Sequence, residues 1–166
     1  FQENDANRNG KNDEIPMTSP HQIAGIIDGL KGAWGLGTRG TDHPNVDVDD
    51  STGTLRFIPT DPKYKEVLQF VSKLYSEKLL DQEIFTMDLP KLAAKGAQDQ
   101  VGFSVASNSA YVGKEQENNF AGLPAALKGP HGDQMHTAMN SGLSAVGTFA
   151  ITKENKHPEA TLRWAD

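Results

Sequence analysis

Helix-type and strand-type patterns alternate along this chain of 166 residues, and that mixture limits the folds it can adopt. Asp61 and Pro62 are typical of the first turn of a helix, and apolar residues at helical spacing follow from Tyr64 to Tyr75. Val46–Val48 and Leu55–Phe57 alternate apolar and polar residues around a turn, which predicts a β-hairpin. The fold class is therefore α/β.

The same patterns predict the remaining elements. Ser19 and Pro20 favour a helix start before the apolar residues Ile23, Ile26 and Leu30. A final helix opens at Pro158 and places Trp164 in the core. Residues 108–142 are irregular, with a third helix expected over 89–97 and strands over 101–105 and 145–151.

Composition limits the classes of protein. Hydrophobic residues make up 36% of the chain, enough for one domain, so residues 1–166 are expected to form a single unit. The net charge of -6 argues against nucleic acid as a partner, since phosphates require a basic patch. The absence of cysteine excludes disulfides, thiolate metal sites and cysteine nucleophiles.

No apolar run approaches the roughly 20 residues that cross a bilayer. The chain begins at Phe1 without a methionine, and its last predicted helix is still running at Asp166. We therefore expect the middle portion of a longer protein.

A loop over residues 5–14 has the ligand pattern of a calcium site. Calcium takes six to eight hard oxygen ligands, and alternating Asp and Asn side chains can converge on one ion. Gly10 permits the sharp turn that such a loop needs. The predicted ligands are Asp5, Asn7, Asn9, the backbone carbonyl of Lys11, Asp13 and Glu14.

The loop departs from an EF-hand at its twelfth position, where Pro16 replaces the usual glutamate. We therefore predict a structural calcium site rather than a switch. The alternative is a solvated turn, since Asn, Asp and Gly favour turns in any case.

His131, Asp133 and His136 could form a metal or acid/base cluster. However, His131 lies in the run Gly129–Pro130–His131–Gly132, which is typical of a turn. No common catalytic motif is present in the chain, so we expect no catalytic residue.

Three residues are candidates for sugar binding. Trp34 lies in the glycine-rich stretch 32–40, where an exposed aromatic ring could stack on a sugar; a core position is the alternative. Ser109 and Tyr111 follow the predicted strand 101–105, and ligands of open α/β folds collect at strand ends; an ordinary loop is the alternative.

Several segments together resemble the extracellular solute-binding proteins of bacterial ABC importers, in particular the lipoprotein-type group that includes the alginate- and oligosaccharide-binding proteins. The segments run in the family's order and cover nearly the whole chain. They are residues 5–16, 57–66, 74–85, 129–132 and 151–166.

The resemblance implies a two-lobed fold like that of periplasmic binding proteins, in which each lobe has a mixed sheet flanked by helices. This chain would form most of the second lobe, and alone it would bind solute weakly. The implied protein is a monomer that captures a carbohydrate and delivers it to ABC permease subunits. It would lie in the periplasm or on the extracellular face of the membrane, attached only by a lipid anchor outside this chain.

In the alginate-binding relatives the same loop holds calcium, which agrees with the ligands predicted above. Two other functions stay open: a polysaccharide-degrading hydrolase, which needs two acids across a cleft, and a calcium-responsive module, which needs paired EF-hands.

Overall fold

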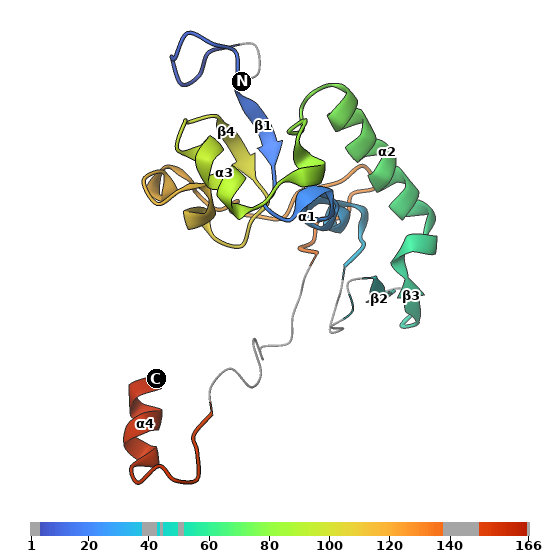
Figure 1. The fold of residues 1–166 in the computed structure, drawn as a ribbon. Helices are drawn as coiled ribbons and strands as arrows, with labels where there is room; N and C mark the ends of the chain where they lie inside the picture. Colours follow the sequence, from blue (N-terminus) through green and yellow to red (C-terminus); the bar gives the residue numbers. More distant parts are fainter. Residues whose placement is uncertain (1–3, 38–42, 44, 50–51, 138–149, 166) are drawn as a thin grey trace.

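The computed structural model describes residues 4–37, 43, 45–49, 52–137 and 150–165. At its centre β1 (Ile15–Thr18) and β4 (Val101–Ser104) run parallel, with Ile15 opposite Val101. Leu80 adds an isolated parallel bridge to Met17 of β1. The strand pair lies between α2 and α3 in the view of Figure 1.

The helices confirm most of the predicted elements. Asp61 caps α2 by accepting a hydrogen bond from the Lys63 N–H at 2.8 Å, and Asp88 caps α3 in the same way. The α-helices are α1 (Gln22–Leu30), α2 (Pro62–Ser76), α3 (Leu89–Gly96) and α4 (Pro158–Ala165). Short 3-10 turns are η1 (Lys31–Trp34), η2 (Ile58–Thr60), η3 (Ile84–Thr86), η4 (Ser109–Val112) and η5 (Glu117–Asn119).

Ser19 does not cap α1 as expected. Its hydroxyl donates to the carbonyl of Val105 at 2.9 Å and so links the start of the helix to the end of β4. The helix begins three residues later, with His21 at the N-cap position.

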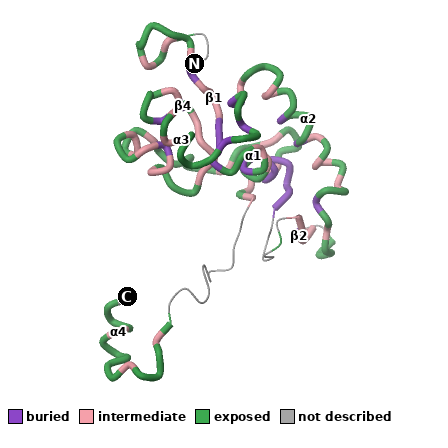
Figure 2. The backbone as a smooth tube through the Cα atoms, in the orientation of Figure 1, coloured by how far each residue is buried: buried purple, intermediate pink, exposed green. Residues whose placement is uncertain are grey.

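The core lies between the central strands, α1 and the inner face of α2. Residues 18–20 between β1 and α1 are buried, and so is the whole of η1. The outer face of α2, in contrast, is exposed (Figure 2). On α2, Val67 and Val71 are buried, while Leu68 is 42% exposed. The apolar stripe predicted for this helix is therefore narrower than its sequence suggests.

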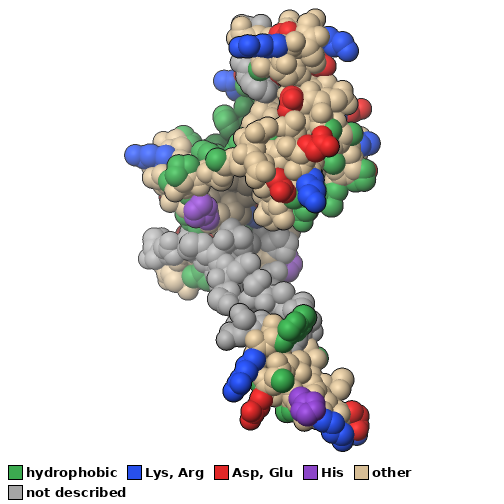
Figure 3. Space-filling model, turned by 90° about the vertical axis from the view of Figure 1, so that its left-hand side faces the viewer, with side chains coloured by type: hydrophobic (Ala, Val, Ile, Leu, Met, Phe, Trp, Pro, Cys, Tyr) green, Lys and Arg blue, Asp and Glu red, His purple; other side chains and the backbone are tan. Residues whose placement is uncertain are grey.

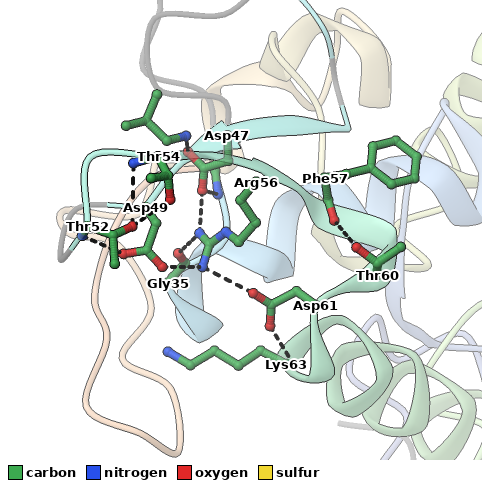
Figure 4. Close-up of polar contacts among 12 residues, drawn as sticks. Gly35, Asp47, Asp49, Thr52, Thr54, Arg56, Phe57, Thr60, Asp61 and Lys63 are labelled. Atoms are coloured by element: carbon green, nitrogen blue, oxygen red, sulfur yellow. Dashed lines mark hydrogen bonds and ion pairs between the residues drawn. The ribbon is translucent and has the colours of Figure 1, made fainter.

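The predicted hairpin is present as β2 (Val46–Val48) and β3 (Leu55–Phe57), paired antiparallel. Arg56 of β3 anchors it: the guanidinium donates to Asp47 at 2.5 Å, to the Gly35 carbonyl at 2.9 Å and to Asp61 at 3.2 Å (Figure 4). The hairpin, the segment after η1 and the start of α2 thus share one polar centre.

The last described element, α4, stands apart from the others in Figure 1. Trp164 on α4 is 85% exposed, so the expectation that it is a core residue is wrong for the described chain. Most of the predicted strand 145–151 lies outside the described residues, and residues 150 and 151 are not in a strand.

The face of the molecule shown in Figure 3 carries both positive and negative side chains. Basic and acidic side chains are dispersed over the face shown in Figure 3, among larger uncharged areas. None of the described helices combines the length and apolar character that crossing a membrane requires.

Candidate metal loop and ligand groove

The loop that precedes β1 is organised by its own side chains. The two carboxylate oxygens of Asp5 accept hydrogen bonds from the N–H groups of Asn9 and Gly10, at 2.9 and 2.7 Å. The amide oxygen of Asn7 also accepts from the Asn9 N–H, at 3.1 Å, and that of Asn9 accepts from the Lys11 N–H, at 2.8 Å. Gly10 has φ = 83°, a conformation that favours glycine.

Glu14 closes the loop from its far end. Its Oε1 accepts hydrogen bonds from the N–H groups of Ala6 and Asn7, at 2.5 and 3.4 Å. Glu14 is only 7% exposed, and its Oε2 is buried without a hydrogen-bond partner among the described residues. A buried carboxylate oxygen without a partner is costly, and a cation would satisfy it. This orphaned oxygen fits the calcium hypothesis.

Asp13 connects the loop to the rest of the fold. Its carboxylate accepts hydrogen bonds from Asn9 at 3.1 Å and from Gln100 at 2.8 Å, and these two bonds lower the pKa of Asp13 below its usual value. Asn7 donates to the carbonyl of Gln98 at 3.1 Å. The loop is therefore tied to the segment that leads into β4.

The predicted oxygen donors lie in one short loop. However, the carboxylates of Asp5, Asp13 and Glu14 do not point at one common position. Within the described ranges, no three Asp, Glu, His or Cys side chains are placed to hold a metal ion together. A cation here would depend on asparagine and backbone oxygens as well as on Asp5, Asp13 and Glu14, as calcium sites commonly do.

A groove of about 1040 Å³ runs along β4 and past its carboxyl end. The Ser107–Ser109 run lines it together with uncharged polar residues such as Gln116 and Asn119, and Phe120 and Leu123 add apolar surface. Ser109 thus lies on the groove, and its role in sugar binding stays a prediction.

The other two sugar-binding candidates lie elsewhere. Tyr111, in η4, is half-buried and packs against the core, and it is not among the residues that line the groove. Trp34 is 6% exposed, and its ring lies 5.4 Å from that of Phe70. The core position, which was the alternative for Trp34, is the one it takes in the described chain.

Sequence reasoning missed a polar cluster on α2. Glu66 accepts a hydrogen bond from the indole N–H of Trp34 at 3.1 Å and pairs with His131 at 2.6 Å. Asp133 pairs with Lys63 at 2.8 Å. The side chains of His131 and Asp133 therefore face α2 rather than each other, and local sequence gives no signal for partners 65 and 70 residues away.

No family model matches the chain. The chain is 32% identical, over a 175-residue alignment and its whole length, to the fructooligosaccharide ABC transporter substrate-binding protein FusA of Streptococcus pneumoniae serotype 4. It spans 30% of that protein.

Two solved structures of S. pneumoniae FusA are similar to the fold. The complex with kestose matches 82% of this chain and 27% of its own, with a TM-score of 0.62 and 24% identity. An EF-hand mutant in complex with fructo-nystose matches 99% of this chain and 32% of its own, with a TM-score of 0.64 and 26% identity.

These matches confirm the expected resemblance and fold class. The chain has the α/β fold of a lobe of an ABC-transporter substrate-binding protein, and it spans about 30% of the length of the proteins it matches. The relatives are substrate-binding proteins of ABC transporters.

Proposed function

We propose that this chain is part of the ligand-binding component of an ABC importer and that its protein captures an oligosaccharide outside the cell. The observation that carries the proposal is the whole-length match to a fructooligosaccharide-binding protein of such an importer. The groove beside β4 supports it, because ligands of open α/β folds bind where strands end.

The groove also favours an uncharged glycan. Its described lining contains hydroxyl and amide side chains and apolar surface, with Asp99 and His136 but no lysine or arginine. An anionic chain such as alginate would find no lysine or arginine for its carboxylates in this lining and would meet the acid Asp99. Hydroxyl and amide groups, in contrast, match the donors and acceptors of a neutral sugar.

In this proposal residues 1–166 form one lobe, the middle portion of a longer, monomeric binding protein. A single lobe provides half of a cleft, so tight binding requires closure against the other lobe. The complete protein would be held outside the cell, by a lipid anchor or in the periplasm, and would deliver its sugar to the permease subunits.

A structural calcium ion completes the proposal. Asp5, Asn7, Asn9, the Lys11 carbonyl, Asp13 and Glu14 would hold it, and the orphaned Oε2 of Glu14 supports this assignment. The ion would supply positive charge to three carboxylates in one short loop. Because the loop is bonded to Gln98 and Gln100, it would fasten the start of β1 to the start of β4.

A glycan panel against the full-length protein tests the function. Kestose, nystose and other neutral oligosaccharides should raise its melting temperature, whereas alginate oligosaccharides should not, and none should be hydrolysed. Release of reducing ends would establish a hydrolase instead. A panel without any stabilising glycan would overturn the proposal.

A further inference from the structure

Residues 129–137 connect the polar cluster on α2 to the ligand groove. At one end of this segment, His131 and Asp133 pair with Glu66 and Lys63 of α2. At the other end, residues 135–137 line the groove together with the Ser107–Ser109 run. The wall that residues 135–137 contribute therefore depends on how the rest of the segment is held.

Glycines allow the segment to lie directly on η1. A Cβ atom at Gly129 would lie 1.6 Å from the carbonyl oxygen of Ala33, and one at Gly32 would lie 2.2 Å from that of Met135. The N–H of Gly32 donates to the hydroxyl of Thr137 at 3.0 Å. The segment is therefore packed closely against η1, and one of its side chains is hydrogen-bonded to it.

Two side-chain contacts to α2 hold the other end of the segment. The Glu66–His131 contact is 2.6 Å long, and the indole N–H of buried Trp34 donates to the same Oε2 atom of Glu66 at 3.1 Å. Lys63 and Asp133 form the second contact, at 2.8 Å. The hydrogen bond from His131 has the largest effect on Glu66; with the charge of His131, the hydrogen bond from Trp34 and the charge of Lys63, it outweighs desolvation and lowers the pKa of Glu66.

We infer that Glu66 and His131 are positioning residues for the oligosaccharide groove: their pairing fixes residues 129–137 so that residues 135–137 form one of its walls. The inference rests on the proposed function. It assigns a role to the turn at Gly129–Pro130–His131–Gly132 and to the burial of Trp34, neither of which contributes a group to the groove lining.

The exposure of the pair separates this role from ordinary stabilisation. The side chains of Glu66 and His131 are 43% and 44% exposed, and exposed ion pairs add little to folding stability. Their loss should therefore affect the position of the segment, and with it sugar affinity, more than it affects the melting temperature.

The test measures kestose affinity by calorimetry, and the melting temperature without sugar, in the full-length protein. His131→Ala should weaken binding about three- to five-fold while shifting the melting temperature by less than about 2 °C. His131→Gln, whose amide can donate to Glu66, should restore affinity to within about two-fold of the wild type. Glu77→Gln, which breaks the exposed Lys73–Glu77 pair at the end of α2, should change neither quantity.

A double variant provides the second readout. Glu66→Ala combined with His131→Ala should bind no more weakly than the worse single variant, because both remove the same contact. Additive losses, or a His131→Ala protein that binds kestose as the wild type does, would overturn the inference while the proposed function stands. A wild-type protein that binds no glycan of the panel would overturn both.

Discussion

Replacing Arg56 by methionine tests whether the ion pair with Asp47 holds the β2–β3 hairpin in place. Asp47 is fully buried, and one of its oxygens accepts hydrogen bonds from Arg56 at 2.5 Å and from the Gly37 N–H at 3.0 Å. Burial disfavours the charge on Arg56, but the hydrogen bond to Asp47 and the charges of Asp47, Asp61 and Asp49 raise its pKa overall. Arg56 is therefore charged at neutral pH, and Figure 4 shows its guanidinium facing Asp47 and Asp61.

Methionine keeps an apolar stem but leaves the Asp47 carboxylate buried without its cation. Breaking a buried ion pair in this way costs about 3 to 5 kcal/mol. The Arg56 side chain is 16% exposed, so the lower end of that range applies. A loss of about 3 kcal/mol corresponds to roughly a 10²-fold larger opening equilibrium.

Hydrogen exchange of the full-length protein measures this opening locally. Amides of residues 46–57 should exchange on the order of 10²-fold faster in Arg56→Met, while those of α3 should keep their rates. The control is Asp49→Asn: this carboxylate is 31% exposed and lies 3.7 Å from Arg56, so its removal should change exchange less than about five-fold. Adding Asp47→Asn to Arg56→Met should recover most of the loss, because no buried charge is then left unpaired.

Two results would refute the reasoning. If Arg56→Met accelerates exchange no more than Asp49→Asn does, the pair contributes little despite its burial. If α3 amides accelerate as much as the hairpin, the ion pair stabilises the whole lobe and does not specifically anchor the hairpin.

The remaining predictions concern the loop and the groove. Calcium at about 100 times its dissociation constant should stabilise the protein by about 2.7 kcal/mol, and EGTA should reverse this stabilisation. Asp5→Ala should abolish the response to calcium. A melting curve that calcium does not shift would contradict the predicted site. In the metal-free protein, the pKa of Asp13 should lie below the usual aspartate value. The ionised Asp13 carboxylate should therefore stabilise the fold above the usual aspartate pKa, and this stabilisation should be lost as the pH falls through the lowered pKa. Asn9→Ala should raise this pKa in a ¹³C NMR titration, and an unchanged midpoint would rule out the hydrogen bond as its cause. Gly96→Ala would place a Cβ atom 1.7 Å from a carbonyl oxygen of η4 and should cost about 1–3 kcal/mol in urea unfolding. Gly122→Ala, with open space around it, is the control, and equal losses would remove the steric explanation.

Elements with local signals were predictable from the sequence. Asp61 and Pro62 start α2 because a capping carboxylate and a fixed φ act within one turn. The hairpin follows from two alternating runs around one turn, and β4 from the alternation after Val101. In each case the residues that determine the element lie within it or directly beside it.

Elements that depend on distant partners were not predictable. β1 has only four residues, one of them Pro16, and is a strand because β4 pairs with it from 86 positions away in the sequence. Trp34 lies in a glycine-rich stretch that suggested an exposed loop, yet α2 covers it and Glu66 accepts its N–H. The groove combines residues from Gly29 to Thr137, so spacing alone could not identify it.

The calcium loop shows how a local pattern and a tertiary contact combine. A standard EF-hand places its closing glutamate at the twelfth position, which is Pro16 here. The structure gives a reason for the departure, because that position already belongs to β1 and pairs with β4. Glu14, two residues earlier, instead folds back to the N–H groups at the start of the loop and keeps one buried oxygen without a partner. In the proposed site the closing acid therefore lies two residues earlier, so that the strand can begin at once, and an ion held there would lie next to the start of the central strand pair.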